Sequence, residues 1–312
     1  MKQKVIAVIG PTASGKTALS VEIAKRFGGE IISADSMQIY KYMDIATAKP
    51  TEDEKQGIPH HLMDFVEPSE SFSVARFCEL ATKAINDIAD RGKLPVIAGG
   101  TGLYVDSLLN GMQFEDQQIN QVLRTSLSME LQEKGIDHML DVIRAFDPAS
   151  AERLSVERNP KRIIRCIEVY RLTGTTQTEL NELQQRYDAP YDALKIGLSA
   201  LDREYLYDRI DRRVDLMMEN GLLEEARRFY DGDFGSTASA AIGYKELLPY
   251  LKGEQELEIC VGNLKRATRR YAKRQQTWFK RDPAVHWFNI DELSFEDIKS
   301  KAEELIRQHI SE

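Results

Sequence analysis

The residues with the clearest chemistry form a phosphate-binding loop near the N-terminus. Gly10-Pro-Thr-Ala-Ser-Gly-Lys-Thr17 fits the pattern GxxxxGK[ST], and it stands between the apolar run Lys4–Ile9 and a helical pattern that begins at Lys16. In such a loop, successive backbone N–H groups and a helix N-terminus surround the oxygens of a phosphate. Lys16 supplies a mobile positive charge, and the Thr17 hydroxyl is placed to bind Mg²⁺. The motif predicts a polyphosphate site without specifying which molecule carries the phosphates.

Asp35 and Thr101 are the next candidates, because each comes soon after a short apolar run. Asp35 follows Glu30–Ala34, and Thr101 lies in the glycine-rich turn after Leu94–Ala98. Ligands of α/β proteins bind at the carboxyl ends of the strands, so we expect both residues beside the phosphate loop. Asp35 could bind Mg²⁺ through water or accept a proton from a nucleophile; alternatively, it caps a helix that follows. Thr101 could offer a hydroxyl to a substrate, although a glycine turn capped by threonine is equally ordinary.

Other candidate metal ligands carry less weight. No acid follows the run Leu94–Ala98 as it would in a Walker-B strand, and Asp64 could substitute for it. His60 and His61 are adjacent, and neighbouring side chains of a strand point to opposite faces, which favours structural roles over metal binding. The cysteines are odd in number and have no CxxC spacing, so we interpret them as small buried apolar residues. They are Cys78, Cys166 and Cys260.

The elements that position these residues predict an α/β fold. Short apolar runs rich in β-branched residues alternate with helical patterns such as Ser73–Asp90. The runs read as strands buried on both faces, as in a parallel sheet. They are Lys4–Ile9, Glu30–Ala34, Leu94–Ala98, Lys195–Leu201 and Val285–Ile290. With the phosphate loop after the first strand, the sequence predicts a parallel-sheet core like that of P-loop NTPases.

Two domains are expected within the chain. Residues 114–190 show helical patterns without a convincing strand, which indicates a helical insertion domain. Residues 1–113 and 191–312 would form the P-loop core, whose C-terminal part is largely helical. The helical patterns are Val122–Lys134, Asp137–Ala145, Pro160–Leu172, Tyr205–Tyr230, Gly243–Leu251, Leu257–Lys280 and Phe295–Ile310.

Composition narrows the class of protein. The chain has 312 residues, 42% hydrophobic and 29% charged, which is typical of a globular protein and excludes disorder and collagen-like repeats. No apolar run approaches the roughly 18 residues that span a bilayer, and none resembles a signal peptide. We expect a cytoplasmic protein without membrane contact.

One basic segment stands out from an otherwise acidic chain. The net charge is −8, but eight Lys and Arg residues and no acids lie between Asn263 and Arg281, which leaves −16 on the rest. On a helix, these charges form two neighbouring rows with aromatic residues between them. This pattern favours nucleic-acid binding over a core-packed aromatic set with idle surface charge. The rows are Lys265, Arg269 and Lys273, and Arg266, Arg270 and Arg274.

Two further groups of basic residues lie outside this segment. The insertion carries Arg158, Arg162 and Arg165 on one helical face with Lys161 beside them, and two basic surfaces on different domains suggest a clamp. Arg209 and Arg213 share a helix face and could neutralise phosphate charge by bidentate contacts. Because Asp208, Asp211 and Asp215 surround them, a surface salt-bridge helix is an equal interpretation.

Seven motifs together resemble the tRNA dimethylallyltransferase family in order and spacing over nearly the whole chain. They are Gly10–Thr17, Asp35-Ser-Met-Gln-Ile-Tyr40, Pro59-His-His-Leu62, Gly99-Gly-Thr-Gly-Leu-Tyr104, Arg209-Ile-Asp-Arg-Arg213, Ala241-Ile-Gly-Tyr244 and Ala272-Lys-Arg-Gln-Gln-Thr-Trp278. The family's usual Gly-Thr-Ala-Lys reads Ala46-Thr-Ala-Lys49 here, and its Asn-Asp before the basic helix of the insertion reads Arg158-Asn-Pro-Lys161. The second departure touches expected RNA contacts.

The resemblance implies a reaction. Members of the family transfer the dimethylallyl group of dimethylallyl diphosphate to N6 of the adenine immediately 3′ of the tRNA anticodon, with Mg²⁺. Asp35 would be the general base, Thr101 would position the base or the diphosphate, and Lys16, Arg213 and Mg²⁺ on Thr17 would stabilise the leaving diphosphate. We also expect a monomer.

The implied binding residues fall into two sets. At the diphosphate, the resemblance places Gly10, Thr12, Ala13, Ser14, Gly15, Lys16, Thr17 and Arg213. At the tRNA, it places Asp35, Ser36, Met37, Gln38, Thr101, Arg124, Lys161, Arg162, Ile163, Arg165, Ile242, Gly243, Lys245, Lys273, Arg274, Gln275, Trp278 and Lys280.

Two other functions remain open from the residues alone. A P-loop kinase using the γ-phosphate of ATP would need the same loop and Asp35. A nucleotide-gated RNA-binding protein would need the loop and the basic segment but no catalytic acid. The basic faces argue against a small-metabolite kinase, and Asp35 argues against binding alone.

Overall fold

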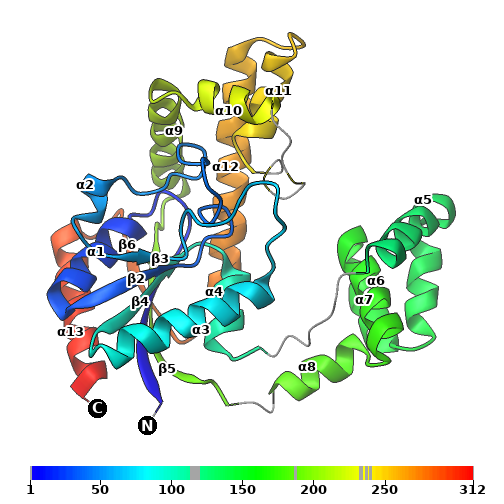
Figure 1. Cartoon of the computed structure of the whole chain (residues 1–312), viewed down its shortest axis with the longest axis horizontal. Coiled ribbons are helices and arrows are strands. Elements are labelled where there is room, and N and C mark those ends of the chain that lie inside the picture. Colours follow the sequence, from blue (N-terminus) through cyan, green and yellow to red (C-terminus); the bar gives the residue numbers. More distant parts are fainter. Residues whose placement is uncertain are drawn as a thin grey trace. The chain divides into compact units, whose positions relative to one another are not determined.

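The computed structural model describes residues 2–112, 120–185, 188–231, 235, 238 and 241–311. The chain divides into two compact units, which Figure 1 shows in the colours of the sequence. The core unit comprises Met1–Leu109 and Pro190–Glu312, and the insert unit comprises Asn110–Ala189. The sequence placed these boundaries at residues 113/114 and 190/191.

A six-stranded parallel sheet forms the centre of the core unit. Its order is β3-β2-β4-β1-β5-β6, and every neighbouring pair is parallel. The strands are β1 (Gln3–Ile9), β2 (Gly29–Ser33), β3 (His60–His61), β4 (Leu94–Gly99), β5 (Tyr191–Ser199) and β6 (Val285–Asn289). This arrangement confirms the predicted α/β fold with a parallel sheet.

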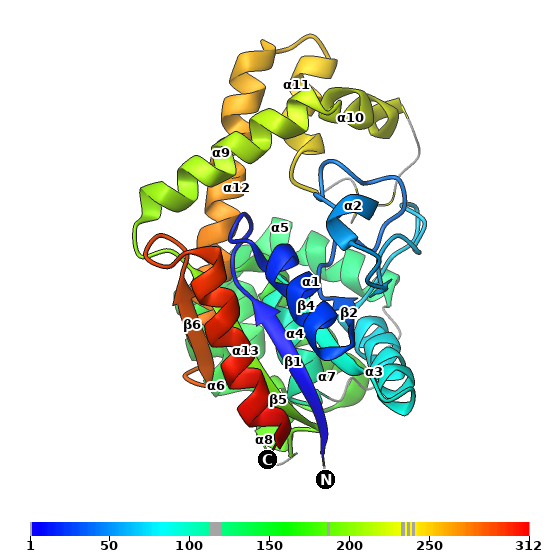
Figure 2. The same ribbon diagram turned by 90° about the vertical axis from the view of Figure 1, so that its left-hand side faces the viewer.

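Helices cover both faces of this sheet, as Figures 1 and 2 show. Helices α1 (Lys16–Phe27) and α13 (Phe295–Ser311) pack on one face, and α3 (Val74–Asp90) and α4 (Gly102–Leu109) pack on the other. β1 supplies Ile6 and Val8 to the first core and Val5, Ala7 and Ile9 to the second. A continuous apolar run is therefore required at β1, because both of its faces are buried.

The remaining helices of the core unit lie beyond the carboxyl ends of the strands (Figure 2). Helices α9 (Arg203–Glu219), α10 (Leu222–Asp231), α11 (Tyr244–Leu251) and the first half of α12 (Leu257–Phe279) share a core with the segment around Ile39 to Met43. The second half of α12 reaches down to the sheet, where Phe279 is buried with α3 and α4. One short helix, α2 (Glu52–Lys55), follows the loop after β2.

The insert unit is helical and has its own core. Its helices are α5 (Gln121–Arg144), α6 (Pro148–Glu157), α7 (Pro160–Thr173) and α8 (Gln177–Gln185). Leu127, Met139, Ile143 and Ile167 are fully buried between α5, α6 and α7. Gly135 has φ 81° inside α5, which explains why the sequence shows two helical patterns on either side of it.

Some predicted elements differ from the structure. The single helix predicted for Tyr205–Tyr230 is two helices, because Gly221 takes φ 93° between α9 and α10 and interrupts the helix there. Helices α2, α4, α6 and α8 were not predicted, and β3 was not among the apolar runs predicted as strands of the sheet. Among the described residues, no helix is both long and apolar enough to cross a membrane.

Candidate active site

A cavity of about 330 Å³ opens at the carboxyl ends of the central strands. The phosphate loop after β1, Asp35 after β2 and Gly99–Gly100 after β4 form its floor. Residues of α9 and α12 and the loop around Ala46 form its walls. The phosphate loop and Asp35 therefore lie beside each other, as expected from the sequence, and both line the same cavity.

The phosphate loop adopts a conformation that needs its glycines. Gly15 has φ 93° at the start of α1, and a Cβ on Gly10, whose φ is 143°, would lie 2.3 Å from the carbonyl oxygen of Leu198. The Ser14 hydroxyl and the Lys16 amino group both donate to the Pro11 carbonyl, at 2.9 and 2.6 Å. Thr17 is exposed on the first turn of α1 and lines the cavity.

Two cations and one carboxylate set the charge of this end of the cavity. Burial and the neighbouring Arg213 lower the pKa of Lys16 to about 7, although Asp35 opposes the shift. Burial also lowers the pKa of Arg213, against the influence of Asp35. Burial removes water that would otherwise stabilise these cations. A bound anion would stabilise them in its place, and the nearby helix N-terminus favours the same anion.

Arg209 and Arg213 both contact the phosphate loop. Arg209 donates through Nε to the Ala13 carbonyl at 2.8 Å, and Arg213 donates to the Thr12 hydroxyl at 3.2 Å. The structure therefore favours the crevice-facing interpretation of these two arginines over a surface salt-bridge helix.

Asp35 uses one carboxylate oxygen to hold its own turn. Oδ1 accepts hydrogen bonds from the backbone N–H groups of Met37 at 2.9 Å and Gln38 at 3.4 Å. A turn follows rather than a helix, so the predicted helix cap is a turn cap. Oδ2 accepts no hydrogen bond within the described part of the chain, which leaves it available to a ligand in the cavity.

Thr101 connects Asp35's turn to the end of β4. Its hydroxyl oxygen accepts from the Ser36 N–H at 3.0 Å, and the hydroxyl donates to Ser36 Oγ at 3.3 Å. Tyr271, which was not among the residues predicted for the site, lines the cavity from α12. Burial and the nearby Asp35 raise the pKa of Tyr271, so its hydroxyl stays protonated at neutral pH.

Helix α12 meets the loop after β4 through two side chains expected at the tRNA. Gln275 is 5% exposed; its Oε1 accepts from the Thr12 N–H at 2.8 Å, and its Nε2 donates to the Gly100 carbonyl at 2.9 Å. Trp278 donates to Asp106 at 2.6 Å. A Cβ on Gly100 would lie 2.1 Å from Gln275, and one on Gly102 would lie 2.2 Å from Trp278. Both side chains are thus engaged within the protein.

The basic segment is neutralised in part by α9. Lys265 pairs with Asp215 at 2.6 Å, and Arg269 forms a two-point contact with Asp211. The segment itself has no acids, as the sequence shows, but two of the three bases in its first row are paired with acids of a neighbouring helix. Six bases of the segment are exposed: Arg266, Arg270, Lys273, Arg274, Lys280 and Arg281.

The basic face of the insert unit is also largely paired. Arg158 contacts Asp137 at 2.8 Å, and Arg162 contacts Glu157 at 2.5 Å. Arg124 and Arg165 both contact the buried Glu168, at 2.8 and 2.9 Å. Lys161 is exposed, whereas Ile163 is fully buried in the insert's core, so the Ile163 side chain serves packing.

The remaining residues expected at the tRNA lie around the cavity. Ser36, Met37, Gln38, Ile242, Gly243 and Lys245 all line it. Gln38 holds the loop opposite, because its amide donates to the carbonyls of Thr47 at 3.2 Å and Ala48 at 3.1 Å.

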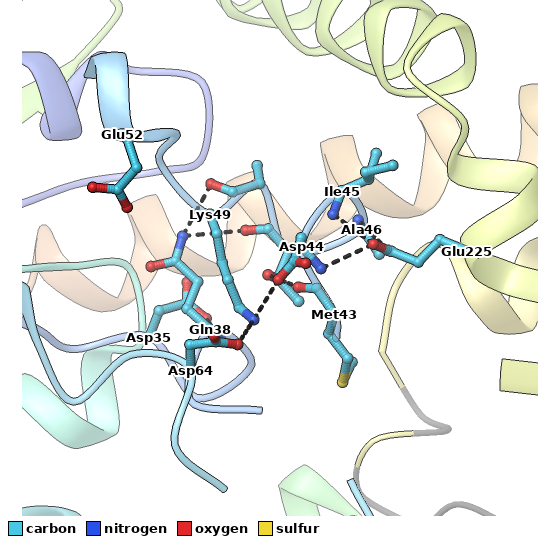
Figure 3. A network of polar contacts seen from close by, with 12 residues as sticks. Asp35, Gln38, Met43, Asp44, Ile45, Ala46, Lys49, Glu52, Asp64 and Glu225 are labelled. Atoms are coloured by element: carbon cyan, nitrogen blue, oxygen red, sulfur yellow. Dashed lines mark hydrogen bonds and ion pairs between the residues drawn. The ribbon is translucent and has the colours of Figure 1, made fainter. Parts of the chain in front are cut away.

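The secondary metal candidates have structural roles instead. Asp64 pairs with Lys49 at 2.5 Å, as Figure 3 shows, and it does not line the cavity. His61 contacts the buried Glu30 at 2.7 Å, and His60 contacts the Ile58 carbonyl at 2.8 Å. Among the described residues, no group of three or more His, Cys, Asp or Glu side chains could hold a metal ion.

The oxygen ligands in the cavity nevertheless fit Mg²⁺ that arrives with a phosphate ligand. Mg²⁺ keeps several waters and is usually bound by one or two protein oxygens and by substrate phosphates. The Thr17 hydroxyl is such an oxygen, and Asp35 could reach the ion through a water molecule; both residues line the cavity.

A parallel sheet in this order, with a GxxxxGK[ST] loop between its central strand and a helix at the ligand-binding edge, defines a P-loop fold. Comparison with known proteins then identifies the family. The family model "IPP transferase" matches residues 38–282. A tRNA dimethylallyltransferase of Acetivibrio thermocellus is 50% identical over 295 residues, covering 94% of each chain. The chain belongs to this family, as the motifs indicated.

Solved structures agree with this assignment. The full-length tRNA isopentenylpyrophosphate transferase from Bacillus halodurans is 42% identical, with a TM-score of 0.75, and the match covers 99% of this chain and 97% of that one. A eukaryotic dimethylallyltransferase acting on tRNA is 31% identical, with a TM-score of 0.80, covering 97% of this chain and 78% of the other.

Proposed function

We propose that this protein transfers the dimethylallyl group of dimethylallyl diphosphate to N6 of the adenine immediately 3′ of a tRNA anticodon, and releases diphosphate. The main support for this proposal is the lining of the cavity. The phosphate loop and two desolvated cations, Lys16 and Arg213, line it together with the carboxylate of Asp35. The family membership of the chain supports the same reaction. We further propose that it acts in the cytoplasm as a monomer.

The phosphate loop would hold the diphosphate as a leaving group. In the reaction, the bond between the allylic C1 and its oxygen breaks, and negative charge develops on that oxygen. Lys16, Arg213 and the N-terminus of α1 would stabilise this charge. Mg²⁺ on Thr17 would add a further positive charge at the same place when bound.

Asp35 would act on the nucleophile. The N6 amine is a weak nucleophile because its lone pair is delocalised into the adenine ring, so a base that accepts its proton as the N6–C1 bond forms lowers the barrier. Oδ1 is held by Met37 and Gln38, which fixes the carboxylate and leaves Oδ2 for the amine. Thr101 would keep this turn in place and help to position the base, and Tyr271, which lines the cavity, would contact it.

The tRNA would bind by way of the exposed bases of α12 and the residues at the mouth of the cavity. The adenine must leave the stacked anticodon loop to reach Asp35, which costs a few kcal/mol. Arg270, Lys273 and Arg274 are exposed and offset this cost by contacts to phosphates. We propose that the insert unit adds contacts through Lys161 and its neighbouring arginines.

One assay distinguishes prenyl transfer from the two alternatives. Purified protein, Mg²⁺ and an unmodified tRNA with adenine after the anticodon are offered dimethylallyl diphosphate or ATP. We expect prenyl incorporation into the RNA. Transfer of the γ-phosphate without prenylation would indicate a P-loop kinase, and RNA binding without either product would indicate a binding protein.

The role of Asp35 has its own test. Asp35→Asn should abolish prenyl transfer while the dissociation constant for tRNA stays close to that of the unmodified protein, because the amide keeps the turn but cannot accept the proton. Asp90→Asn, at an exposed carboxylate at the end of α3, is the control and should leave both quantities unchanged. Equal losses of binding and rate would show that Asp35 serves tRNA binding.

A further inference from the structure

Glu225 is a buried carboxylate with no place in the reaction described above. It lies on the first turn of α10 and is 1% exposed. Oε2 accepts from the backbone N–H groups of Asp44 and Ile45, each at 2.9 Å. Oε1 accepts from the Ala46 N–H and from the Tyr244 hydroxyl, also at 2.9 Å. Figure 3 shows the carboxylate reaching the loop from the side of α10.

Three successive N–H groups that converge in this way form an anion-binding nest. In this protein the anion is a side chain that lies 181 residues from Asp44 along the chain. Four donors match the acceptor capacity of one carboxylate, so the buried charge is well compensated. Loss of the carboxylate would leave three partly buried N–H groups without this partner, and the loop would have to rearrange to find new ones.

The loop that Glu225 holds is a wall of the cavity. Ala46, Thr47 and Ala48 line the cavity, and Gln38 holds the carbonyls of the last two from the opposite side. On α11's side the fit is close, because a Cβ on Gly243 would lie 3.2 Å from the Cβ of Ala46. A small shift of this loop would therefore change the width of the cavity.

The surroundings of this wall are apolar. Val214, Met217 and Leu222 line the same cavity beyond Arg213, which contacts the phosphate loop. A donor with its diphosphate on that loop would have a short apolar chain to bury, and these side chains and Ala46 offer the surface for it.

We propose that Glu225 is a positioning residue for prenyl transfer, which fixes residues 44–46 so that Ala46 and its neighbours close the cavity around the dimethylallyl group. This inference rests on the proposed function, in that the cavity holds the prenyl donor. Glu225 itself touches neither substrate.

The first test separates donor binding from tRNA binding. Glu225→Ala should raise the KM for dimethylallyl diphosphate about tenfold, since the loop loses its three hydrogen bonds to a charged group. The dissociation constant for tRNA should not change. Tyr244→Phe removes only the fourth hydrogen bond and keeps the nest filled, so it should stay close to the unmodified protein in KM.

The second test uses chemical rescue. The atoms that Glu225→Ala removes beyond Cβ correspond to acetate, so sodium acetate should refill the nest. We expect acetate, but not sodium chloride at the same ionic strength, to raise the melting temperature of Glu225→Ala and to lower its KM for the donor. Glu224→Ala, at the exposed neighbouring acid, should show no response to acetate.

The outcomes distinguish this inference from the proposed function. A folded Glu225→Ala variant with an unchanged KM for the donor would overturn the inference, and so would a loss of tRNA affinity equal to the rise in KM. If Glu225→Ala is insoluble, Glu225→Gln, which keeps the volume, is judged by the same two quantities. Failure of the unmodified protein to prenylate tRNA would instead refute the proposed function, whereas the acetate-dependent melting temperature needs no substrate.

Discussion

Lys16 is subject to opposing demands from its environment. Burial and Arg213 favour its neutral form and bring its pKa to about 7, whereas Asp35 and a bound diphosphate favour the charged form. The amino group donates to the Pro11 carbonyl. The residue is therefore poised to gain a proton when the donor binds at pH values above 7.

This predicts a pH dependence of donor binding. Below pH 7, Lys16 is already protonated in the free protein, and no uptake is expected. Above pH 7, it is mostly neutral, so binding of dimethylallyl diphosphate should take up close to one proton and become weaker as the pH rises. Calorimetry at pH 8 in two buffers of different ionisation enthalpy measures this uptake.

Lys16→Arg is the control, because a guanidinium stays charged over this range. Its binding heat should be much less dependent on the buffer. If the heat for the unmodified protein is the same in both buffers, Lys16 is not the group that titrates.

At the residue scale, local motifs predicted the residues on the floor of the cavity. They did not predict the residues that hold or form its walls. Lys16, Asp35 and Thr101 stand in short patterns that follow strands, and such patterns carry their meaning locally. Glu225 has no such pattern, because its partners are the backbone of a distant loop. Tyr271 was visible only as one aromatic residue within a basic helix.

At the scale of elements, helix α12 serves two surfaces at once. Its buried side carries Gln275, which connects the phosphate loop to the turn after β4. Its exposed side carries Arg270, Lys273 and Arg274. The helix thus links the place proposed for the diphosphate to the place proposed for the RNA.

Substitution of Gln275 tests whether this link is structural. Gln275→Met keeps the volume but leaves the Thr12 N–H and the Gly100 carbonyl unpaired, at about 1–3 kcal/mol for each buried group. We expect a lower melting temperature and a higher KM for the donor, with tRNA affinity retained. A loss of tRNA affinity with an unchanged donor KM would instead make Gln275 a direct RNA contact.

The helical periodicity of the sequence predicts α12 itself but not the ion pairs that α12 forms with other helices. The length of α12 and its two basic rows follow from the sequence, since helical spacing alone defines them. The partners of Lys265 and Arg269 do not, because they depend on which helix packs beside α12. From the sequence, Asp211 and Asp215 could have paired with the arginines of their own helix. In the structure these acids pair with bases of α12, and Arg209 and Arg213 contact the phosphate loop instead.

At the scale of the whole molecule, charge is distributed unevenly. The chain carries −8 overall, yet six exposed bases gather along α12 and just after its end. Two other bases of that segment are neutralised by α9. Only the exposed ones are free to replace the counterions of an RNA backbone.

The salt dependence of tRNA binding should report this distribution. The double substitution Arg270→Ala and Arg274→Ala should reduce the slope of log K against log salt by about one for each lost phosphate contact. Filter binding or fluorescence titration over a range of salt concentrations measures the slope.

A matched control removes two cations elsewhere. Lys299→Ala and Arg307→Ala change the net charge equally but lie on α13, where both side chains pair with acids of the same helix. The slope of this variant should match that of the unmodified protein. Equal slopes for both double variants would mean that overall charge, and not the surface of α12, controls binding.

The close contacts of α12 with Gly100 and Gly102 limit how this region of the sequence can evolve. Each residue inserted into a helix turns everything beyond it by about 100°. An insertion before Gln275 would break the close contacts of Gln275 with Gly100 and of Trp278 with Gly102. It would also turn the exposed bases on one side of the insertion relative to these contacts. Natural variants of this helix should therefore differ by substitution at exposed positions, while its length stays constant.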